Sequence, residues 1–525
     1  MKDANRVIVI GGGVGGLAAA VRLAAGERRV TLVEKGDAVG GKLNRWVAAD
    51  PGQADEPAAG RAFSFDTGPS LLTLPLVLAD LFAAAGRDVR DAVELVKLDP
   101  VSRFVWGDGA TLELRPGREN AVEAVRRFAP GDADGFAKLL DFGRHVWDLS
   151  GELFLSKSPE QALRGDGTFS PARALALLTV PLRIGMFRKF APLVDRHIKS
   201  PRLREVLYQY ATYGGSSPFL APATLAVIPY VELEMGGWYV RGGMYAIANS
   251  LQALASDLSV DIRTHTAATR VLTTGDGKDK RVRGVEIAGG ETLDADAVVM
   301  NADVMYAYRD LVAAEDRPSW PDTKLAKVEP GGSGMVLLLG VRGTYPQLAH
   351  HTKFMPDDYT SDLRAMFETR TVPDDPCIYV CASTRTDPTQ APPDCENLFV
   401  LCSAPPLDGR IDWAVEGPRY RDKIVRTLET KFGLTDLSKR IVVEKAMTPA
   451  DLKQRYNANA GSIYGISGNG VKQAFLRPPN RDRDVKGLFF AGGATHPGGG
   501  LPLVMLSGKI AAEHAAEYLA TDGHG

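Results

Sequence analysis

Short apolar runs alternate with glycine-rich turns near the start of the chain. Val7–Ile10 is wholly apolar, Leu17–Ala25 is rich in alanine, and Val30–Val33 is a second apolar run. Strands that are apolar at every position are typical of parallel sheets buried on both faces. The pattern therefore predicts a buried strand, a turn, a helix and a second buried strand over residues 7–34.

The turn between this strand and this helix has the spacing G-x-G-x-x-G, at Gly11, Gly13 and Gly16. The first glycine permits a tight turn, the second lets a pyrophosphate approach the backbone, and the third lets helix and strand pack closely. The helix N-terminus offers free N–H groups to phosphates. Glu34 ends the second strand, where it can bind both hydroxyls of an adenosine ribose and repel a 2′-phosphate. Together these features predict a dinucleotide site.

A strand, a glycine-rich loop and a helix recur near the other end of the chain. Gly487–Ala491 is predicted as a buried strand and Leu503–Leu519 as a helix, while Gly40, Gly41 and Lys42 form a further glycine turn closed by a cation. This organisation resembles the large flavoprotein group that includes amine oxidases and carotenoid desaturases, and the resemblance implies FAD rather than NAD. The second helix would aim its N-terminus at the flavin and stabilise the negative charge that collects there on reduction.

Longer stretches narrow this resemblance to the bacterial-type phytoene desaturases. The stretches that carry it are "IPYVELEMGGWYVRGGMYAIANSLQALA" (228–255), "ADAVVMNAD" (295–303), "DPTQAPPDCENLFVLCSAPP" (387–406) and "HPGGGLPLVMLSGK" (496–509). They occur in the family's order and span essentially the whole chain. The resemblance implies an FAD enzyme that converts carbon–carbon single bonds of a long isoprenoid to double bonds by hydride transfer to flavin N5, acting on a phytoene-like C40 or a diapophytoene-like C30 substrate.

The resemblance also implies which residues contact FAD. They are Gly11, Gly13, Val14, Gly15, Gly16, Glu34, Lys35, Gly41, Lys42, Val271, Gly493, Gly500 and Leu503. Val271 takes the position at which the backbone normally meets the adenine. One departure concerns Gly493-Ala494, because many flavoproteins of the wider group place an acid there to bind ribityl or pyrophosphate oxygens.

The expected fold class is α/β, with a Rossmann-like, glutathione-reductase-like FAD-binding domain interleaved with a mixed-sheet substrate domain and a helical, lid-like or membrane-facing region. The expected boundaries are 1–70, 226–303 and 481–525 for the three FAD-binding parts, 71–225 for the helical region and 304–480 for the substrate domain. Within them, Met244–Ser256 is predicted as a helix, and Val260–Arg263, Thr269–Thr273 and Ala297–Asn301 are predicted as strands.

Composition excludes several classes of function. The 525 residues carry 62 Lys and Arg against 64 Asp and Glu, a formal net charge of −2, so no basic surplus favours nucleic acid. Four cysteines within residues 377–402 form no disulfide framework, which favours a reducing compartment. Cys377 and Cys381 lie in a strand-like stretch and are interpreted as buried apolar residues rather than zinc ligands, so no metal is expected. His350 and His351 are interpreted as an exposed loop.

Candidate catalytic residues carry alternative interpretations. Glu232 and Glu234 lie two apart in a strand-like segment, so they would share a face and could handle a proton or stabilise a cation, or else be paired surface acids. His496 lies in the predicted flavin loop, where it could shuttle protons or, as we favour, hold the loop by a hydrogen bond. The sequence names no catalytic base.

No signal peptide and no run of about 18 apolar residues is apparent, so a cytoplasmic protein without a membrane-spanning helix is expected. The stretch 174–194 is apolar but interrupted by Pro181, Arg183, Arg188 and Lys189. It could lie in a membrane interface or form an internal lid helix. A lipid-soluble substrate favours peripheral contact with the cytoplasmic membrane, with oxygen or a quinone as the electron acceptor.

Other functions fit the same scaffold. A carotenoid oxygenase that oxidises a terminal methyl and a carotenoid isomerase would share the "THPGGGLP" loop (495–502). A non-enzymatic prenyl-binding escort protein resembles the fold but does not use flavin, and the intact glycine fingerprint argues against it. An amine oxidase is a weaker alternative, since the loop lacks the cysteine of covalent flavoproteins.

Overall fold

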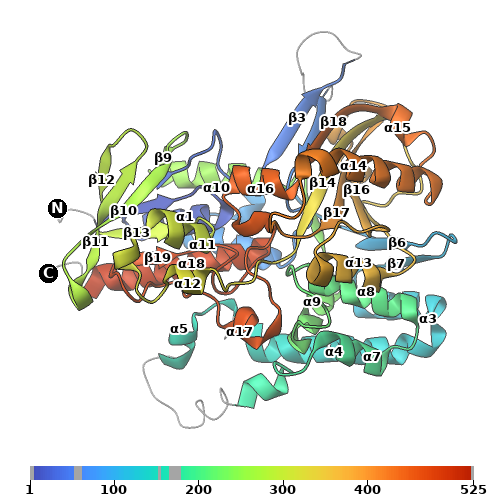
Figure 1. Ribbon diagram of the computed structural model, residues 1–525, viewed down its shortest axis with the longest axis horizontal. Coiled ribbons are helices and arrows are strands. Elements are labelled where there is room, and N and C mark those ends of the chain that lie inside the picture. Colours follow the sequence, from blue (N-terminus) through green and yellow to red (C-terminus); the bar gives the residue numbers. More distant parts are fainter. Residues whose placement is uncertain (1–4, 52–61, 152–154, 165–178, 522–525) are drawn as a thin grey trace.

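The computed structural model describes residues 5–51, 62–151, 155–164 and 179–521. It confirms the expected α/β class, with a nucleotide-binding fold at the left of Figure 1, a large mixed sheet at the upper right and a group of helices at the lower right. Both chain ends lie on the side of the nucleotide-binding fold (Figure 1).

The nucleotide-binding fold is built on a five-stranded parallel sheet. Its strands, in spatial order, are β19 (Leu488–Phe490), β13 (Ala297–Met300), β1 (Arg6–Ile10), β2 (Arg29–Val33) and β9 (Asp261–Arg263). Val7 and Val9 face a core shared with four helices, whereas Ile8 and Ile10 face a second core on the other side. Burial on both faces is the reason why every position of this strand is apolar.

Helices cover one face of this sheet and a small sheet covers the other. The helices that share the core with β1 are α1 (Val14–Ala25), α2 (Pro75–Ala84), α10 (Ala246–Asp257) and α18 (Leu501–Thr521). The opposite core contains the antiparallel strands β10 (Ala268–Thr274), β11 (Arg281–Ile287) and β12 (Thr292–Asp294) and the short helix α11 (Val304–Tyr306).

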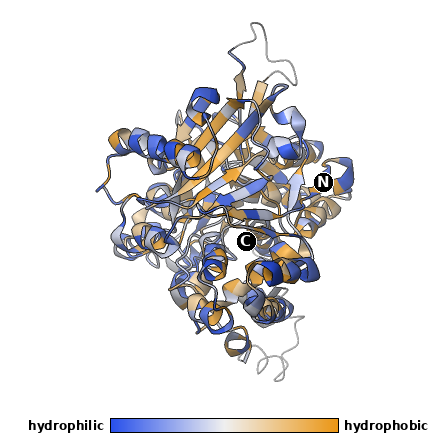
Figure 2. Ribbon diagram, turned by 90° about the vertical axis from the view of Figure 1, so that its right-hand side faces the viewer, coloured by the Kyte–Doolittle hydropathy of each residue, from blue (hydrophilic) through white to orange (hydrophobic). Residues whose placement is uncertain are grey.

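A seven-stranded mixed sheet forms the second half of the molecule. Its spatial order is β18 (Ile441–Met447), β14 (Ser333–Arg342), β17 (Cys395–Ala404), β16 (Ile378–Cys381), β15 (His351–Phe354), β6 (Ser102–Val105) and β7 (Thr111–Leu114). Helix α14 (Trp413–Thr430) packs on one face of this sheet. Figure 2 views this side of the molecule and shows several strands in orange inside bluer outer helices.

A group of helices lies beside this sheet. It consists of α3 (Arg118–Phe128), α4 (Ala133–Ser150), α7 (Phe190–His197), α8 (Pro201–Thr212) and α9 (Val227–Tyr230), which share one apolar core. The remaining short helices are α5 (Pro159–Arg164), α12 (Asp322–Leu325), α13 (Tyr359–Arg364), α15 (Leu437–Arg440), α16 (Pro449–Tyr456) and α17 (Gly470–Phe475). Two-stranded pairs are formed by β3 (Arg45–Ala49) with β4 (Ala62–Asp66) and by β5 (Leu95–Lys97) with β8 (Trp238–Val240).

The segment 71–225 is not wholly helical, because it also contributes β5, β6 and β7. The hairpin of β6 and β7 joins the edge of the seven-stranded sheet through a parallel pairing of β6 with β15. Each of its strands has only four residues with alternating burial. The sequence pattern of such short, half-polar strands is weak, and the segments next to them in the sequence have strongly helical patterns.

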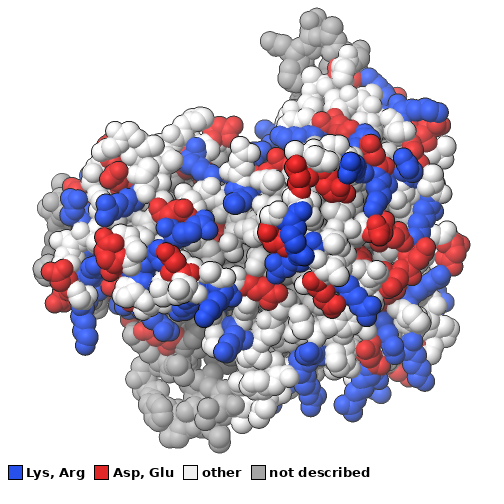
Figure 3. Space-filling model, in the orientation of Figure 1, with Lys and Arg blue, Asp and Glu red and all other residues white. Residues whose placement is uncertain are grey.

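None of the described helices is long and apolar enough to cross a bilayer. Positive and negative side chains are interspersed over the face seen in Figure 3, so no field of one sign dominates it.

A cavity between two glycine loops and the mixed sheet

One cavity of about 570 Å³ joins the nucleotide-binding fold to the seven-stranded sheet. Its first wall is made by glycine loops and includes Gly11, Gly13, Val14, Glu34, Lys35, Gly41, Lys42, Gly493, Gly500 and Pro502. Its second wall comes from the helical group and the mixed sheet and includes Gln209, Tyr213, His351, Lys353, Cys377, Tyr379, Phe399 and Leu401. A ligand held by the glycine loops would therefore face the mixed sheet directly.

The turn between β1 and α1 leaves no room for side chains. Gly11 has a φ of +97°, and a Cβ there would lie 2.7 Å from the carbonyl oxygen of Asn301. A Cβ on Gly13, the N-cap of α1, would lie 2.7 Å from the Asn301 Oδ1. No acidic residue occupies the first turn of α1, so its free N–H groups remain available to an anion.

Gly15 and Gly16 serve packing and do not line the cavity. A Cβ on Gly16 would lie 2.1 Å from the Gly11 carbonyl oxygen, and one on Gly15 would lie 2.7 Å from the Asn301 Nδ2. Their small size lets helix α1 approach the end of β13. They act on the loop conformation and not on the cavity surface.

Glu34 and Lys35 line the cavity beyond the end of β2. The two carboxylate oxygens of Glu34 accept hydrogen bonds from the backbone N–H groups of Gly12, at 2.7 Å, and Gly36, at 2.8 Å. These bonds hold the carboxylate beside the glycine turn. The Lys35 ammonium donates to the Asn457 Oδ1 at 3.0 Å.

Lys42 is a half-buried cation on the cavity wall. Its Nζ donates to the carbonyl oxygens of Ser462, at 3.0 Å, and Ile463, at 2.6 Å. Burial lowers the pKa of Lys42 to about 8, and the nearby Asp303 carboxylate partly opposes this shift. Lys42 ties the second glycine turn to the segment that carries Tyr464, another residue of the cavity wall.

The loop before α18 reaches the same cavity. Gly493, Gly500 and Pro502 line it, whereas Leu503 packs against the apolar core of the nucleotide-binding fold. A Cβ on Gly493 would lie 3.3 Å from the Gly499 Cα, so the two arms of the loop lie in close contact. The first turn of α18 holds no acidic residue.

Val271 and His496 lie away from the cavity wall. Val271 is 1% exposed in the core between the five-stranded sheet and β10–β12, and residues 266–268 line the cavity instead. The His496 Nε2 lies 3.0 Å from the Lys157 carbonyl oxygen, and its backbone oxygen accepts from Asn480 and Ser507. These bonds brace the loop.

The expectation that Glu232 and Glu234 share one face of a strand is wrong. They lie in a π-helical turn, Val231–Met235, that continues α9. Glu232 is fully buried and accepts a hydrogen bond of 3.0 Å from the Tyr210 hydroxyl. Glu234 pairs instead with Arg144 and, at 3.8 Å, with Arg118. Neither glutamate lines the cavity, so the two acids do not form a pair at the site.

Lys353 connects Glu232 to the cavity through tyrosine. Its ammonium donates to the Tyr213 hydroxyl at 2.8 Å, and Tyr213 lies against Glu232, whose carboxylate helps to raise the pKa of that tyrosine. Lys353 is 3% exposed on β15, and burial lowers its pKa while Glu232 opposes the shift. The cavity wall therefore carries a buried network of lysine, tyrosine and glutamate.

A second polar chain reaches the cavity from β15 and β16. The Tyr379 hydroxyl lies 2.6 Å from the Ser70 Oγ and 2.7 Å from the His351 Nδ1. His350 and His351 are 5% and 2% exposed, so their interpretation as an exposed loop is wrong. His351 begins β15, an inner strand of the mixed sheet, and its ring packs against those of His350 and Tyr379.

Sequence reasoning missed this polar wall. The strand reads "HTKF", in which three of four side chains are polar, although all four residues are buried. Hydrophobic periodicity cannot identify such a strand. The sequence features that could indicate this strand are its position between two turns and the later strand-like run "CIYVC", with which it can pair.

A buried acid behind this wall yields a pH prediction. Asp362 accepts from the Cys377 N–H at 3.3 Å and the Ser403 Oγ at 3.2 Å, and burial raises its pKa to about 7. The folded protein therefore holds the proton of the Asp362 carboxyl more tightly than the unfolded chain does. The contribution of this proton to the free energy of unfolding is complete below about pH 4. It is lost as the pH rises to about 7, by up to about 1.4 kcal/mol per pH unit.

Asp362→Asn is therefore expected to be more stable than the wild type at pH 8, with the advantage vanishing near pH 4. Urea unfolding of both proteins between pH 4 and pH 8 measures this difference. An advantage that stays constant across the range would show that Asp362 does not titrate there.

Comparisons with known proteins identify the family of this chain. A family model described as flavin containing amine oxidoreductase matches residues 14–516. A 4,4′-diapolycopene oxygenase from Methylomonas sp is 36% identical over 510 residues, which cover 97% of each chain. A 4,4′-diaponeurosporene oxygenase from Staphylococcus aureus (strain MRSA252) is 32% identical over 510 residues, with the same coverage.

Solved structures share the fold. Cyclohexylamine oxidase from Brevibacterium oxydans IH-35A has a TM-score of 0.61 at 17% identity and covers 98% of this chain and 100% of its own. An oxidoreductase from Methanosarcina mazei has a TM-score of 0.61 at 14% identity, with coverage of 97% and 100%. At this identity the likeness concerns the fold alone.

Proposed function

Because the chain belongs to the family of flavin-containing amine oxidoreductases, we propose that it is an FAD-dependent enzyme that introduces oxygen at a terminal methyl of an acyclic carotenoid. The flavin cofactor and the link to flavoproteins of this group, both expected from the sequence, are confirmed by the family match. The observation that carries the proposal is the cavity that joins the glycine loops to the mixed sheet.

The residues of the first wall fit FAD. We assign the pyrophosphate to the turn of Gly11, Gly13 and Val14, in which Cβ atoms on the two glycines would collide with Asn301, and the adenosine ribose to Glu34. The loop of Gly493 and Gly500 would lie along the flavin, with the N-terminus of α18 directed at it. The groups of the first wall come from the expected nucleotide-binding parts 1–70 and 481–525, to which 226–303 adds residues 266–268, whereas those of the second wall come from 71–225 and 304–480.

When bound, FAD would pass the electrons removed from the terminal methyl to molecular oxygen, which also supplies the inserted atom, so that the methyl and O₂ give an aldehyde and water. The chain's own task is to hold the reacting carbon beside the flavin and to exclude water. Phe399 and Leu401 offer an apolar surface, while the hydroxyls of Tyr213 and Tyr379 add polar groups to the same wall. Lys353 and Glu232 keep the Tyr213 hydroxyl in place through the network described above.

Desaturation is the second candidate, because the motifs of the sequence resemble phytoene desaturases. The names of the relatives favour oxygenation over it. The polar side chains of the second wall also suit a product that carries oxygen at its end better than one that stays wholly apolar.

A substrate panel separates these functions. The flavin-loaded protein would be incubated in vesicles with 4,4′-diapolycopene, with a saturated acyclic precursor and with a primary amine, and the consumption of each would be followed by chromatography. We expect only the diapolycopene to be consumed. Because its polyene is already fully conjugated, a desaturase would leave it unchanged and consume the saturated precursor, and an amine oxidase would consume the amine.

We further propose that the protein meets this substrate at a membrane surface. Leu182 and Phe187 are 68% and 64% exposed, and Leu476 is 73% exposed at the end of α17. The segments are adjacent, since Val180 and Ile184 share a small core with Phe475. Arg183, Arg188 and Lys189 are exposed among these apolar residues, as suits lipid phosphates. Residues 174–178 of the predicted interfacial stretch lie outside the described part of the chain.

The double variant Leu182→Ser/Phe187→Ser is expected to weaken binding to anionic vesicles at least about tenfold, because two large apolar side chains no longer enter the interface. Vesicle co-flotation measures this effect. Val415→Ser is the matched control, since Val415 is 50% exposed on α14, outside these segments. Equal flotation of all three proteins would contradict the proposed membrane face.

A further inference from the structure

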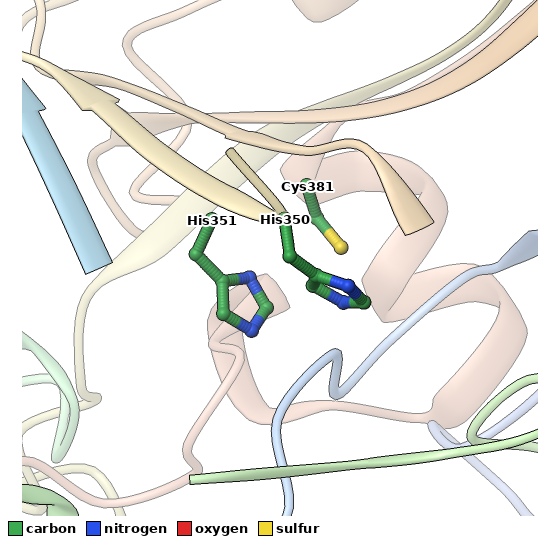
Figure 4. A group of neighbouring side chains, drawn as sticks. All are labelled: His350, His351 and Cys381. Atoms are coloured by element: carbon green, nitrogen blue, oxygen red, sulfur yellow. The ribbon is translucent and has the colours of Figure 1, made fainter. Parts of the chain in front are cut away.

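His350, His351 and Cys381 form a buried cluster behind the cavity wall. One ligand atom from each side chain lies within 4.8 Å of the others. His351 and Cys381 are directly opposite each other in the antiparallel pairing of β15 and β16, and His350 immediately precedes β15. Figure 4 shows the three side chains projecting from these neighbouring strands into one space.

Both imidazoles keep unused binding capacity. The His350 Nδ1 lies 2.6 Å from the Thr386 Oγ1, and the His351 Nδ1 lies 2.7 Å from the Tyr379 hydroxyl. The Nε2 of each ring is buried without a hydrogen-bond partner. A buried polar atom that lacks a partner costs about 1–3 kcal/mol. Each ring is thus oriented by a hydroxyl on one nitrogen, as metal-binding histidines are by their outer partners.

The three side chains offer the electron pairs that a divalent cation needs. Two come from imidazole nitrogens, and the third comes from the Cys381 sulfur once its proton is released on metal binding.

We propose that His350, His351 and Cys381 bind one transition-metal ion of the zinc or copper kind. Two imidazoles and a thiolate are ligands that these ions prefer, whereas magnesium and calcium prefer oxygen. The ion would lie directly behind the part of the cavity wall formed by His351 and Tyr379. Neither the sequence pattern nor the relatives' names assign this site, and it does not depend on the proposed function.

Zinc alone serves as the probe. The flavin-loaded protein, prepared without a metal-binding tag, would be dialysed against zinc and passed through gel filtration, and its metal content would be measured by mass spectrometry. We expect about one zinc ion per chain in the wild type and none in Cys381→Ala or His350→Gln. Cys395→Ser is the matched control, because Cys395 is also buried but lies outside the cluster. This control should keep its zinc.

X-ray absorption at the zinc edge tests the same site in the wild type alone, in case the variants fail to fold. We expect one sulfur at about 2.3 Å and two nitrogens at about 2.0 Å from the metal. Zinc bound without sulfur, zinc retained equally by all the variants, or no stoichiometric zinc in the wild type would each overturn the proposal.

Discussion

Gly13→Val is expected to yield a protein that purifies without its yellow cofactor. A side chain at this position meets the Asn301 Oδ1, 2.7 Å from the Cβ, and projects into the place assigned to the pyrophosphate. Overpacking of this kind costs about 1–3 kcal/mol, which corresponds to about 5- to 150-fold weaker FAD binding. Titration of the apoprotein with FAD, followed by flavin fluorescence, measures the change.

Gly26→Ala provides the matched control at the other end of the same helix. Gly26 is the exposed C-cap of α1, and a Cβ there would make only an ordinary contact, 3.4 Å from the Leu23 carbonyl oxygen. This variant should bind FAD like the wild type. If the Gly13→Val protein kept a wild-type flavin content, the pyrophosphate would have to bind at another place.

Lys353→Met is expected to lower the free energy of unfolding by about 3–5 kcal/mol, because it leaves the buried Glu232 carboxylate without its cation. Glu232→Gln should have a similar effect by leaving the ammonium uncompensated. The double variant should lose clearly less than the sum of the two single variants, since removing both charges removes both penalties. Denaturant unfolding of the four proteins completes the cycle.

Glu123→Gln is a suitable control for this cycle. Glu123 forms surface ion pairs with Arg126 and Arg127 along α3, so its loss should change the stability little. Additive effects of Lys353→Met and Glu232→Gln would mean that the two groups act independently and that Tyr213 does not connect them.

Much of the nucleotide-binding fold could be predicted because its signals are local. The predicted strand Val260–Arg263 corresponds to β9, and the predicted helix Leu503–Leu519 lies within α18. The glycines at 11 and 13 are required by a positive φ and by a close approach to Asn301, both of which depend on backbone geometry within one turn. Such constraints are visible as residue type and spacing.

The second wall could not be predicted because distant segments create it. Lys353 is buried by a strand pairing and by Tyr213, which lies 140 positions away. The alternation in "VELE" (231–234) favours a strand, yet these residues continue a helix that packs on the helical group. Tertiary packing overrides local preference at both places. Glu232 and Glu234 therefore do not lie side by side, and the polar groups that face the cavity come from β15 and β16 instead.

We propose that this flavoprotein adds oxygen to a carotenoid. The most direct test is the mass of the product formed from 4,4′-diapolycopene by the flavin-loaded protein in vesicles, with the apoprotein as the blank. We expect a product heavier by oxygen, formed only when FAD is bound. Unchanged diapolycopene after incubation with the holoenzyme would contradict the account.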